Sequence, residues 1–433
     1  MAAYLLTPAE RAIYRRYAGL ALPRHTSYPT APAWQASYGA PEFRADLERS
    51  TIKNRPLSVY VHVPYCERLC YYCACTKEIV PPGKHRQTDP APSWLDSLEM
   101  EINRVAAIVG NRSVDQLHLG GGSPTFLSAD QLERLGRILS HSLRVAPTAE
   151  MAVEIDPRIT SREQLQVLRK LGFNRVSLGI QDFDPKVQQI VNRLQPLDVV
   201  QRVVTWCREL GFGSINFDLI YGLPLQTFES LEATLAKTIA LQPDRIAFYR
   251  LAVIPEIFRW QNVFHPEDLP GADLCLDLNL LAINQFQAAG YEFIGLDHFA
   301  RTGEALTTAR QSGTLQRNFQ GMSTGKGLDL IGLGPSAISM LDDVYAQSVK
   351  TTEKWALAVQ HELATERGLR LDNDDRLRRE LLQQLYGHGC IDKRTLEADF
   401  GIDFDTFFAS ELTRLDSVIN DGLATVDDDT IRL

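Results

Sequence analysis

Four of the chain's seven cysteines crowd into one ten-residue stretch, and this cluster constrains the fold more than any other feature. Cys66, Cys70 and Cys73 have the spacing C-x3-C-x2-C, and Cys75 follows as C-x-C. The apolar, β-branched run 57–63 directly before them predicts a buried strand. Clustered thiolates on a loop at a strand's carboxyl end suit an iron–sulfur cluster, which usually has four cysteine ligands. We expect only the first three cysteines to bind, which leaves one iron open for a small molecule.

A structural zinc site is the alternative for these cysteines. Zinc sites usually have two separated pairs of ligands, and no second pair follows at a suitable distance. Spacing alone leaves Cys75 either as a fourth ligand or as a neighbour of the site. The remaining Cys207, Cys275 and Cys390 stand alone in apolar segments. We expect these three to be buried, unreactive thiols.

Strand-like runs alternate with amphipathic helical runs from residue 57 onward. The six predicted strands cover 57–63, 116–119, 151–155, 175–178, 215–220 and 245–249. Such alternation predicts right-handed βαβ units and a parallel sheet, so the fold class is α/β. Six units fit an open, partial (β/α)6 barrel better than a closed eight-fold one. Functional groups should then lie at the carboxyl ends of the strands.

Shifts in composition predict three domains. An N-terminal helix and arm cover residues 1–50, and the four prolines between residues 20 and 50 indicate an extended arm. This arm either packs on the barrel surface or covers the active site. The partial barrel and its extension cover residues 51–350. A small helical, winged-helix-like domain covers residues 351–433 and ends in a hairpin at 424–433.

The composition is that of a soluble globular protein, with 44% hydrophobic and 23% charged residues. The net charge of -9 argues against binding to nucleic acid or to an anionic membrane. Apolar runs are too short to span a bilayer, and the N-terminus lacks the basic and apolar regions of a signal peptide. We therefore expect a cytoplasmic protein, because a reducing cytosol would keep the clustered thiols available. We also expect the protein to be a monomer.

Polar residues follow several of the predicted strands. The glycine run 120–122 follows the second strand and would let backbone approach a ligand closely. Glu154, Gln181 and Asp218 lie in or just after the next three strands, and Arg193 comes shortly after Gln181. A charge inside an apolar strand costs free energy unless it is paired. These groups therefore either form structural ion pairs or converge on a ligand at the barrel mouth.

The cysteine motif and the glycine run that follows it resemble the radical SAM superfamily. More narrowly, nearly the whole chain is similar to the oxygen-independent coproporphyrinogen III oxidase family, also called coproporphyrinogen dehydrogenases. The motifs that carry this resemblance are residues 26–30, 60–64, 73–75, 153–157, 218–224, 297–301 and 317–321.

The resemblance implies a [4Fe–4S] cluster on Cys66, Cys70 and Cys73, and two molecules of S-adenosylmethionine. One electron from a low-potential donor, such as flavodoxin or ferredoxin, cleaves S-adenosylmethionine to methionine and a 5′-deoxyadenosyl radical. The radical removes a hydrogen from a propionate of the tetrapyrrole substrate, and loss of CO₂ and an electron leaves a vinyl group. Two cycles would convert coproporphyrinogen III to protoporphyrinogen IX in haem biosynthesis.

The resemblance also implies roles for individual residues. It assigns the first S-adenosylmethionine site to Tyr60, Gly121, Glu154, Ala252 and Ile338. It assigns the second to Tyr72, Gly122, Ser123, Gln181, Arg193 and Asp218. The residues implied as catalytic are Tyr60, Glu154 and Cys75. The candidates to bind the substrate's four carboxylates are Arg24, Arg301 and Arg317.

One run differs from the family pattern. Residues 250–255 keep the alanine of a common Asn-Tyr-Ala-His-type run but lack its aromatic and imidazole groups. Two alternatives to the main interpretation follow. One is a paralogous radical enzyme that acts on another porphyrin or on haem, and the other is a haem-binding or haem-trafficking protein.

Overall fold

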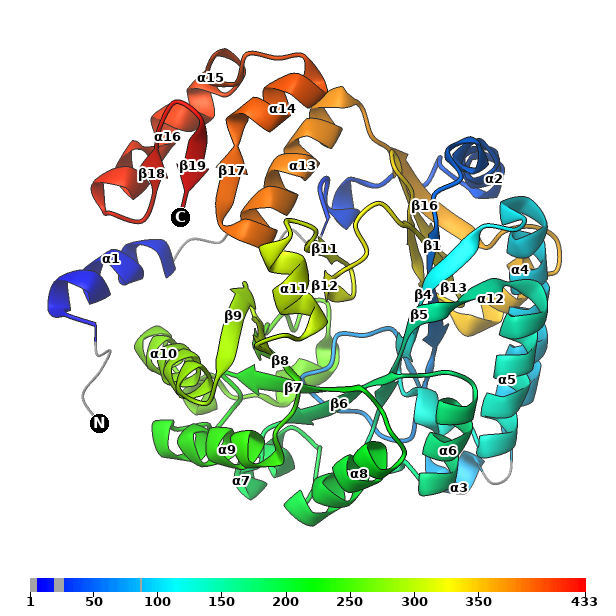
Figure 1. The fold of residues 1–433 in the computed structure, drawn as a ribbon. Helices are drawn as coiled ribbons and strands as arrows, with labels where there is room; N and C mark the ends of the chain where they lie inside the picture. Colours follow the sequence, from blue (N-terminus) through cyan, green and yellow to red (C-terminus); the bar gives the residue numbers. More distant parts are fainter. Residues whose placement is uncertain (1–5, 19–26, 86–87) are drawn as a thin grey trace. The chain divides into compact units, whose positions relative to one another are not determined.

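The computed structural model describes residues 6–18, 27–85 and 88–433, which form two compact units (Figure 1). The barrel unit contains residues 35–290 and 327–369, and the helical unit contains residues up to 34, 291–326 and 370–433. Each unit therefore combines segments that are far apart in the sequence. The expected domain boundaries after residues 50 and 350 do not coincide with the boundaries of these units.

The barrel unit is built on a sheet with the strand order β16-β15-β14-β13-β1-β4-β5-β6-β7-β8. Its strands are β1 (Leu57–Val63), β4 (Ser113–Gly121), β5 (Arg144–Ile155), β6 (Arg175–Gln181), β7 (Ser214–Tyr221), β8 (Arg245–Arg250), β13 (Asp329–Leu333), β14 (Ile338–Met340), β15 (Val344–Ser348) and β16 (Thr365–Arg370). Each of the six predicted strands lies within one of these, from β1 to β8. Sequence periodicity located them because their apolar residues are buried, as in β1, where only the central Tyr60 is partly exposed.

All neighbouring pairs from β1 through β8 are parallel. A helix follows each of these strands along the chain: α4 (Ala91–Val109), α5 (Ala129–Ser142), α6 (Arg162–Lys170), α8 (Leu197–Glu209), α9 (Phe228–Leu241) and α10 (Ala272–Ala288). The α/β class with six strand–helix units is confirmed. Parallel strands joined by helical crossovers place all six carboxyl ends at one edge of the sheet, and this edge carries the candidate site.

Several helices begin where the sequence predicts. Ser128 and Ser161 form capping boxes with Gln131 and Gln164, at the starts of α5 and α6. Asp184 accepts two backbone hydrogen bonds at the start of α7 (Pro185–Ile190). Each cap stabilises its helix by about 1 kcal/mol, so the loops that precede these helices end at defined residues.

The expectation of an extended arm throughout residues 20–50 is wrong for its last part. Helix α2 (Ala40–Ser50) occupies it, and Pro41 lies in the first turn, where a missing N–H costs little. The Gly39 N–H donates to the Glu42 carboxylate at 2.9 Å, and Phe43 and Leu47 are buried. The proline thus starts a helix here instead of preventing one.

The shorter elements of the barrel unit are β2 (Tyr65–Cys66), β3 (Glu78–Ile79), α3 (Pro82–His85), α12 (Thr352–Ala358) and the 3-10 helices η2 (Thr51–Lys53), η3 (Pro124–Phe126), η4 (Arg259–Val263) and η5 (Pro266–Asp268). In the described part of the chain, no helix is both long and apolar enough to cross a membrane.

The helical unit has its own apolar core, which includes Leu377, Leu396, Phe404 and Ile431. Its elements are α1 (Pro8–Ala18), η1 (Ala31–Ala33), β9 (Tyr291–Gly295), β10 (His298–Arg301), α11 (Ala305–Gln311), β11 (Gln316–Asn318), β12 (Gly321–Ser323), α13 (Asn373–His388), β17 (Cys390–Asp392), α14 (Lys393–Phe400), α15 (Phe404–Phe407), α16 (Ala409–Asn420), β18 (Thr425–Val426) and β19 (Thr430–Arg432). The predicted C-terminal hairpin is present as β18 and β19, and β17 pairs with β19.

Residues 27–34 of the arm pack within the helical unit. The Ser27 hydroxyl donates to the Pro29 carbonyl at 3.1 Å, and the Trp34 ring meets Phe319 edge-on at 5.7 Å between centroids. Residues 24–26, including the substrate candidate Arg24, lie outside the described residues.

Candidate active site

The cysteine loop leaves the carboxyl end of β1 and is fixed by distant parts of the barrel unit. The Asn192 amide donates to the Leu69 carbonyl at 2.7 Å, and the Tyr71 N–H donates to the Val191 carbonyl at 3.0 Å. Near the start of the loop, β2 pairs with β3. These contacts fix the loop at both ends, so the cysteines are held by structure and not only by sequence proximity.

Trp260 and Lys77 fix the C-x-C turn. The Trp260 indole N–H donates to the Cys73 carbonyl at 3.2 Å, and the Lys77 ammonium donates to the carbonyls of Cys73 and Cys75, both at 3.1 Å. The ammonium also lies 4.4 Å from the centroid of the Trp260 ring, as a cation–π contact. Neither residue was predicted, and no local pattern could reveal Trp260, which lies 187 positions from Cys73.

One cavity of about 190 Å³ collects most of the expected site residues at the carboxyl ends of the strands. Those that line it are Cys66, Cys70, Cys73, Cys75, Tyr72, Gly121, Gly122, Ser123, Glu154, Gln181, Arg193 and Asp218. Further residues that were not expected at the site also line it: Arg68, Lys77, Ile155, Asp156, Arg158, Ser177 and Gly179. Residues from five separate strand ends thus face one space, which we call the site cavity.

Three expected site residues do not line the site cavity. Tyr60 lies in β1 with its hydroxyl 3.0 Å from Nδ1 of His62. Ala252 is exposed just after β8, where its carbonyl accepts a hydrogen bond from Gln261 at 3.0 Å. Ile338 begins β14. Their proposed contact with a cofactor therefore stays a prediction.

The clustered cysteines have unequal surroundings. Burial raises the pKa of the Cys66 thiol to about 12. A hydrogen bond with Cys75 lowers the pKa of Cys73, and the same contact raises the pKa of Cys75. All seven cysteines are free; Cys207 and Cys275 are buried as expected, whereas Cys390 is half-buried. Cys73 thus ionises more readily than Cys66 or Cys75, and the thiolate is the form that binds metal.

Among the described residues, no three or more His, Cys, Asp or Glu side chains converge on a position that would hold a single metal ion. A [4Fe–4S] cluster has a different requirement, because each cysteine ligand binds a separate iron. Its ligands must surround a cavity, as Cys66, Cys70 and Cys73 do. The donor set and its arrangement around one space fit a cluster.

The glycine run 120–122 at the carboxyl end of β4 is required first for internal packing. A Cβ on Gly120 would lie 2.7 Å from the Glu154 carboxylate, and a Cβ on Gly122 would lie 2.6 Å from the Tyr65 carbonyl oxygen. The Gly122 N–H also donates to the Val63 carbonyl at 2.7 Å. The strand end therefore fits closely against the start of the cysteine loop, and this close fit lets Gly121 and Gly122 reach the site cavity.

Two carboxylates face the site cavity from β5 and β7, the strands on either side of β6. Glu154 accepts from the Gly121 N–H at 3.2 Å and lies 3.0 Å from His118 Nε2. Asp218 accepts hydrogen bonds from the hydroxyl of Ser177 and the amide of Asn216, each at 2.9 Å. Burial, with the nearby charge of Glu154, raises the pKa of Asp218 to about 6. A buried carboxylate of raised pKa in a cavity is typical of a functional site.

Gln181 ends β6 in an unusual backbone conformation, with a φ of 67°. Non-glycine residues seldom adopt positive φ, and such strain is concentrated at functional sites. The conformation reaches the site cavity from β6, beside Gly179, where a Cβ would lie 2.9 Å from the Arg193 guanidinium.

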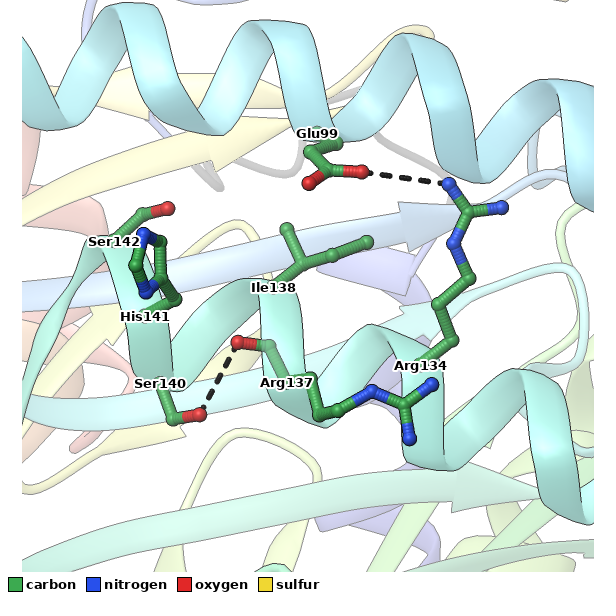
Figure 2. A pocket seen from close by; sticks show the side chains of 7 residues that line it. All are labelled: Glu99, Arg134, Arg137, Ile138, Ser140, His141 and Ser142. Carbon is green, nitrogen blue, oxygen red and sulfur yellow. Dashed lines mark hydrogen bonds and ion pairs between the residues drawn. The ribbon is translucent and has the colours of Figure 1, made fainter.

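A larger depression of about 660 Å³ lies between α4 and α5 (Figure 2). It is lined by Glu99, Arg134, Arg137, Ile138, Ser140, His141 and Ser142. Arg134 pairs there with Glu99 at 3.3 Å, and the Ser140 hydroxyl donates to the Arg137 carbonyl at 3.2 Å (Figure 2). The expected site residues all lie elsewhere, so we call this region the α4–α5 depression and do not assign the chemistry to it.

Comparison with known proteins agrees with this geometry. Residues 60–237 match the radical SAM superfamily. The oxygen-independent coproporphyrinogen III oxidase of Escherichia coli is 40% identical, over 95% of this chain and 89% of that protein. The enzyme of the same name from Pseudomonas aeruginosa is 42% identical, over 96% of this chain and 90% of that protein.

This chain belongs to the oxygen-independent coproporphyrinogen III oxidase family. A solved structure of the Escherichia coli coproporphyrinogen III oxidase, described as a radical SAM enzyme, matches with a TM-score of 0.91 and 39% identity. The match covers 98% of this chain and 94% of that one. The resemblance predicted from the sequence motifs is therefore confirmed.

Proposed function

We propose that this chain oxidatively decarboxylates two propionates of coproporphyrinogen III to vinyl groups, giving protoporphyrinogen IX in haem biosynthesis. Two enzymes of this name are 40% and 42% identical to nearly the whole chain. The observation that carries the proposal is the site cavity, because three free cysteines and the polar ends of five strands surround one space.

Membership of the radical SAM superfamily supplies the cofactors, a [4Fe–4S] cluster and S-adenosylmethionine. Cys66, Cys70 and Cys73 would hold the cluster, since they are free and line the site cavity together. When bound, the two cofactors supply a carbon radical that can remove a hydrogen from an unactivated C–H bond. The exposed Cys75 lies beside this group, and we assign it no iron.

The polar residues of the site cavity would bind and orient S-adenosylmethionine. Glu154, with its side chain 41% exposed, can accept hydrogen bonds from ribose hydroxyls or an ammonium group. Asp218 in β7 can also accept such hydrogen bonds, and Gln181 at the end of β6 lies between the strands of these two carboxylates. The second S-adenosylmethionine would use Tyr72, Gly122, Ser123, Gln181, Arg193 and Asp218.

Substrate and electron donor complete the proposal. Arg317 of the helical unit is 8% exposed, and its guanidinium contacts the Met322 sulfur at 4.0 Å. Together with Arg301 it is a candidate to bind substrate carboxylates, because guanidinium groups bind carboxylates in a bidentate fork. A low-potential protein such as flavodoxin or ferredoxin would supply the electron.

Anaerobic turnover tests this function. Purified protein would be loaded with iron and sulfide, and supplied with coproporphyrinogen III, S-adenosylmethionine and a low-potential reductant. Mass spectrometry should show the loss of two CO₂ per porphyrinogen, together with methionine and 5′-deoxyadenosine. If S-adenosylmethionine is cleaved while coproporphyrinogen III keeps all four carboxylates, the chain acts on another tetrapyrrole.

A further inference from the structure

Two guanidinium groups contact the sulfur of a single cysteine in the site cavity. Arg158 Nη2 lies 3.7 Å from Cys70 Sγ, and Arg193 Nη1 lies 3.6 Å from the same atom. Arg158 follows β5, and Arg193 follows α7. The arrangement therefore depends on the fold, and sequence spacing gave no sign of it.

Asp156 holds Arg158 in place. Arg158 Nε lies 2.9 Å from Asp156 Oδ1, and its Nη2 lies 2.6 Å from Oδ2, which is a two-pronged ion pair. Both side chains are about one-seventh exposed, at 14% and 13%. Burial raises the pKa of Asp156, but Arg193 and Arg158 outweigh it and lower that pKa to about 2. The carboxylate is thus ionised and fixes the guanidinium beside Cys70.

Arg193 is held mainly by backbone. Its Nη2 donates to the Gly179 carbonyl at 2.6 Å, and its Nη1 lies 3.5 Å from Asp156 Oδ2. One carboxylate is thus shared by two cations, so these three groups together place one net positive charge beside the Cys70 sulfur. Charge and hydrogen bonds at cysteine sulfurs are among the factors that set the potential of an iron–sulfur cluster.

We propose that Arg158, positioned by Asp156, raises the reduction potential of the cluster bound at Cys70. This inference rests on the proposed function, because it needs a cluster on that cysteine. One electron enters the cluster during reduction and makes it more negative. A fixed cation beside a ligand sulfur stabilises that reduced state, and it does so strongly in a buried site of low dielectric. Arg158 is thus a positioning residue that acts on the cluster through Cys70.

The test measures the cluster's midpoint potential in wild-type protein and in R158Q, R158K and R162Q. Each would be loaded with iron and sulfide without oxygen, assayed for iron, and titrated with dithionite while EPR follows the reduced cluster. At the wild-type midpoint, the ratio of reduced to oxidised cluster in R158Q should be about tenfold lower, which corresponds to about 59 mV for one electron. R158K keeps the positive charge but cannot form the two-pronged pair with Asp156, so its midpoint should lie between those of wild-type protein and R158Q.

R162Q is the matched control. Arg162 lies four residues further on, at the start of α6, and pairs with Glu209 on the surface at 2.6 Å. The R162Q substitution removes the same charge at a surface position, so the midpoint of this variant should equal that of wild-type protein. An R158Q protein with full iron content and an unchanged midpoint would overturn the inference, even if its turnover is slow.

A second variant keeps the inference testable if R158Q holds no iron. R158K keeps the positive charge but loses the two-pronged pair with Asp156, so its midpoint should lie below that of wild-type protein. An unchanged or higher midpoint in R158K would overturn the inference. Wild-type protein that binds no cluster would instead refute the proposed function, so the two failures are distinct.

Discussion

The site cavity and the α4–α5 depression each contain an arginine–carboxylate group, yet the two groups differ in burial. In the cavity, the side chains of Asp156, Arg158 and Arg193 are 13%, 14% and 9% exposed. In the depression, the Arg134 side chain is 31% exposed and its partner Glu99 is 46% exposed. Arginine–carboxylate groups thus occur both inside the protein and at its surface, and Figure 2 shows the exposed one.

This difference in burial distinguishes a functional site from an ordinary group of surface ion pairs. Removing charges from water costs several kcal/mol per ion, and an ion pair offsets that cost only with favourable geometry. An exposed pair has no such cost and contributes little. The depression has the larger volume, about 660 Å³ against about 190 Å³. Buried charge beside free thiols therefore marks the site better than volume does.

The largest expected effect is the loss of the cluster in C70S. A serine hydroxyl cannot replace a thiolate as an iron ligand at neutral pH, so this variant should lose the brown iron–sulfur absorption and all turnover. Iron assay and visible absorption after anaerobic loading would measure it. C390S is the control, because Cys390 lies in β17 of the helical unit and should not affect iron content. Undiminished iron in C70S would disprove the ligand assignment.

The next effect is a pH dependence caused by Asp218. Its folded-state pKa is about 6, above the ordinary value of 3.8, so the folded protein keeps a proton that the unfolded chain loses between these pH values. This group's contribution therefore lowers the free energy of unfolding as pH rises from 4 to 6, by roughly 3 kcal/mol in total. In urea unfolding of the cofactor-free protein, D218N should lack this decrease. If the free energies of unfolding of wild-type protein and D218N change in parallel with pH, burial does not raise the pKa of Asp218.

A methyl group added at the edge of the site cavity should have a comparable or smaller effect. G122A places a Cβ 2.6 Å from the Tyr65 carbonyl oxygen, which is backbone and cannot move aside cheaply. Overpacking of this kind costs about 1–3 kcal/mol, and G122A should also bind iron less completely. In G83A the new Cβ meets nothing within 4 Å, so thermal unfolding should match wild-type protein or improve slightly. Equal unfolding temperatures for the two variants would contradict the close fit described here.

The smallest expected effect is that of a substitution in the α4–α5 depression. R134Q breaks the pairs of Arg134 with Asp96 and Glu99, at 2.5 and 3.3 Å, but both partners are exposed. Such pairs contribute about 0.2–1 kcal/mol, so unfolding should change by less than that and turnover should not change. A strong loss of turnover in R134Q would reverse the comparison and assign a function to the depression.

The fold of the barrel unit was largely predictable, because its signals are local. Alternating runs of buried residues located the six strands, and the serines at 128 and 161 located two helix starts. Helix α2 was missed because Pro41 was interpreted as a breaker, although it lies in the first turn. The association of 291–326 with 370–433 was also missed, since no local pattern records which distant segments share a core.

The site was predictable where motifs carry it. The cysteines, the glycine run and the strand-end carboxylates face one cavity, as expected. Arg158 and Trp260 were missed, because each acts on the cysteine loop from 88 and 187 residues away, respectively. A hint existed for Asp156, which lies in the motif 153–157, but only the fold shows that its partners reach Cys70.

The most direct test of the central claim is the EPR spectrum of the reduced cluster with and without S-adenosylmethionine. We expect the cluster in the site cavity to have one iron that is open to S-adenosylmethionine. Addition of S-adenosylmethionine to reduced wild-type protein should therefore change the g-values of the cluster signal, and E154Q, which alters the first S-adenosylmethionine site, should need a higher concentration for the same change. A cluster signal that S-adenosylmethionine leaves unchanged in wild-type protein would contradict the account, because it would mean that no iron is open to the cofactor.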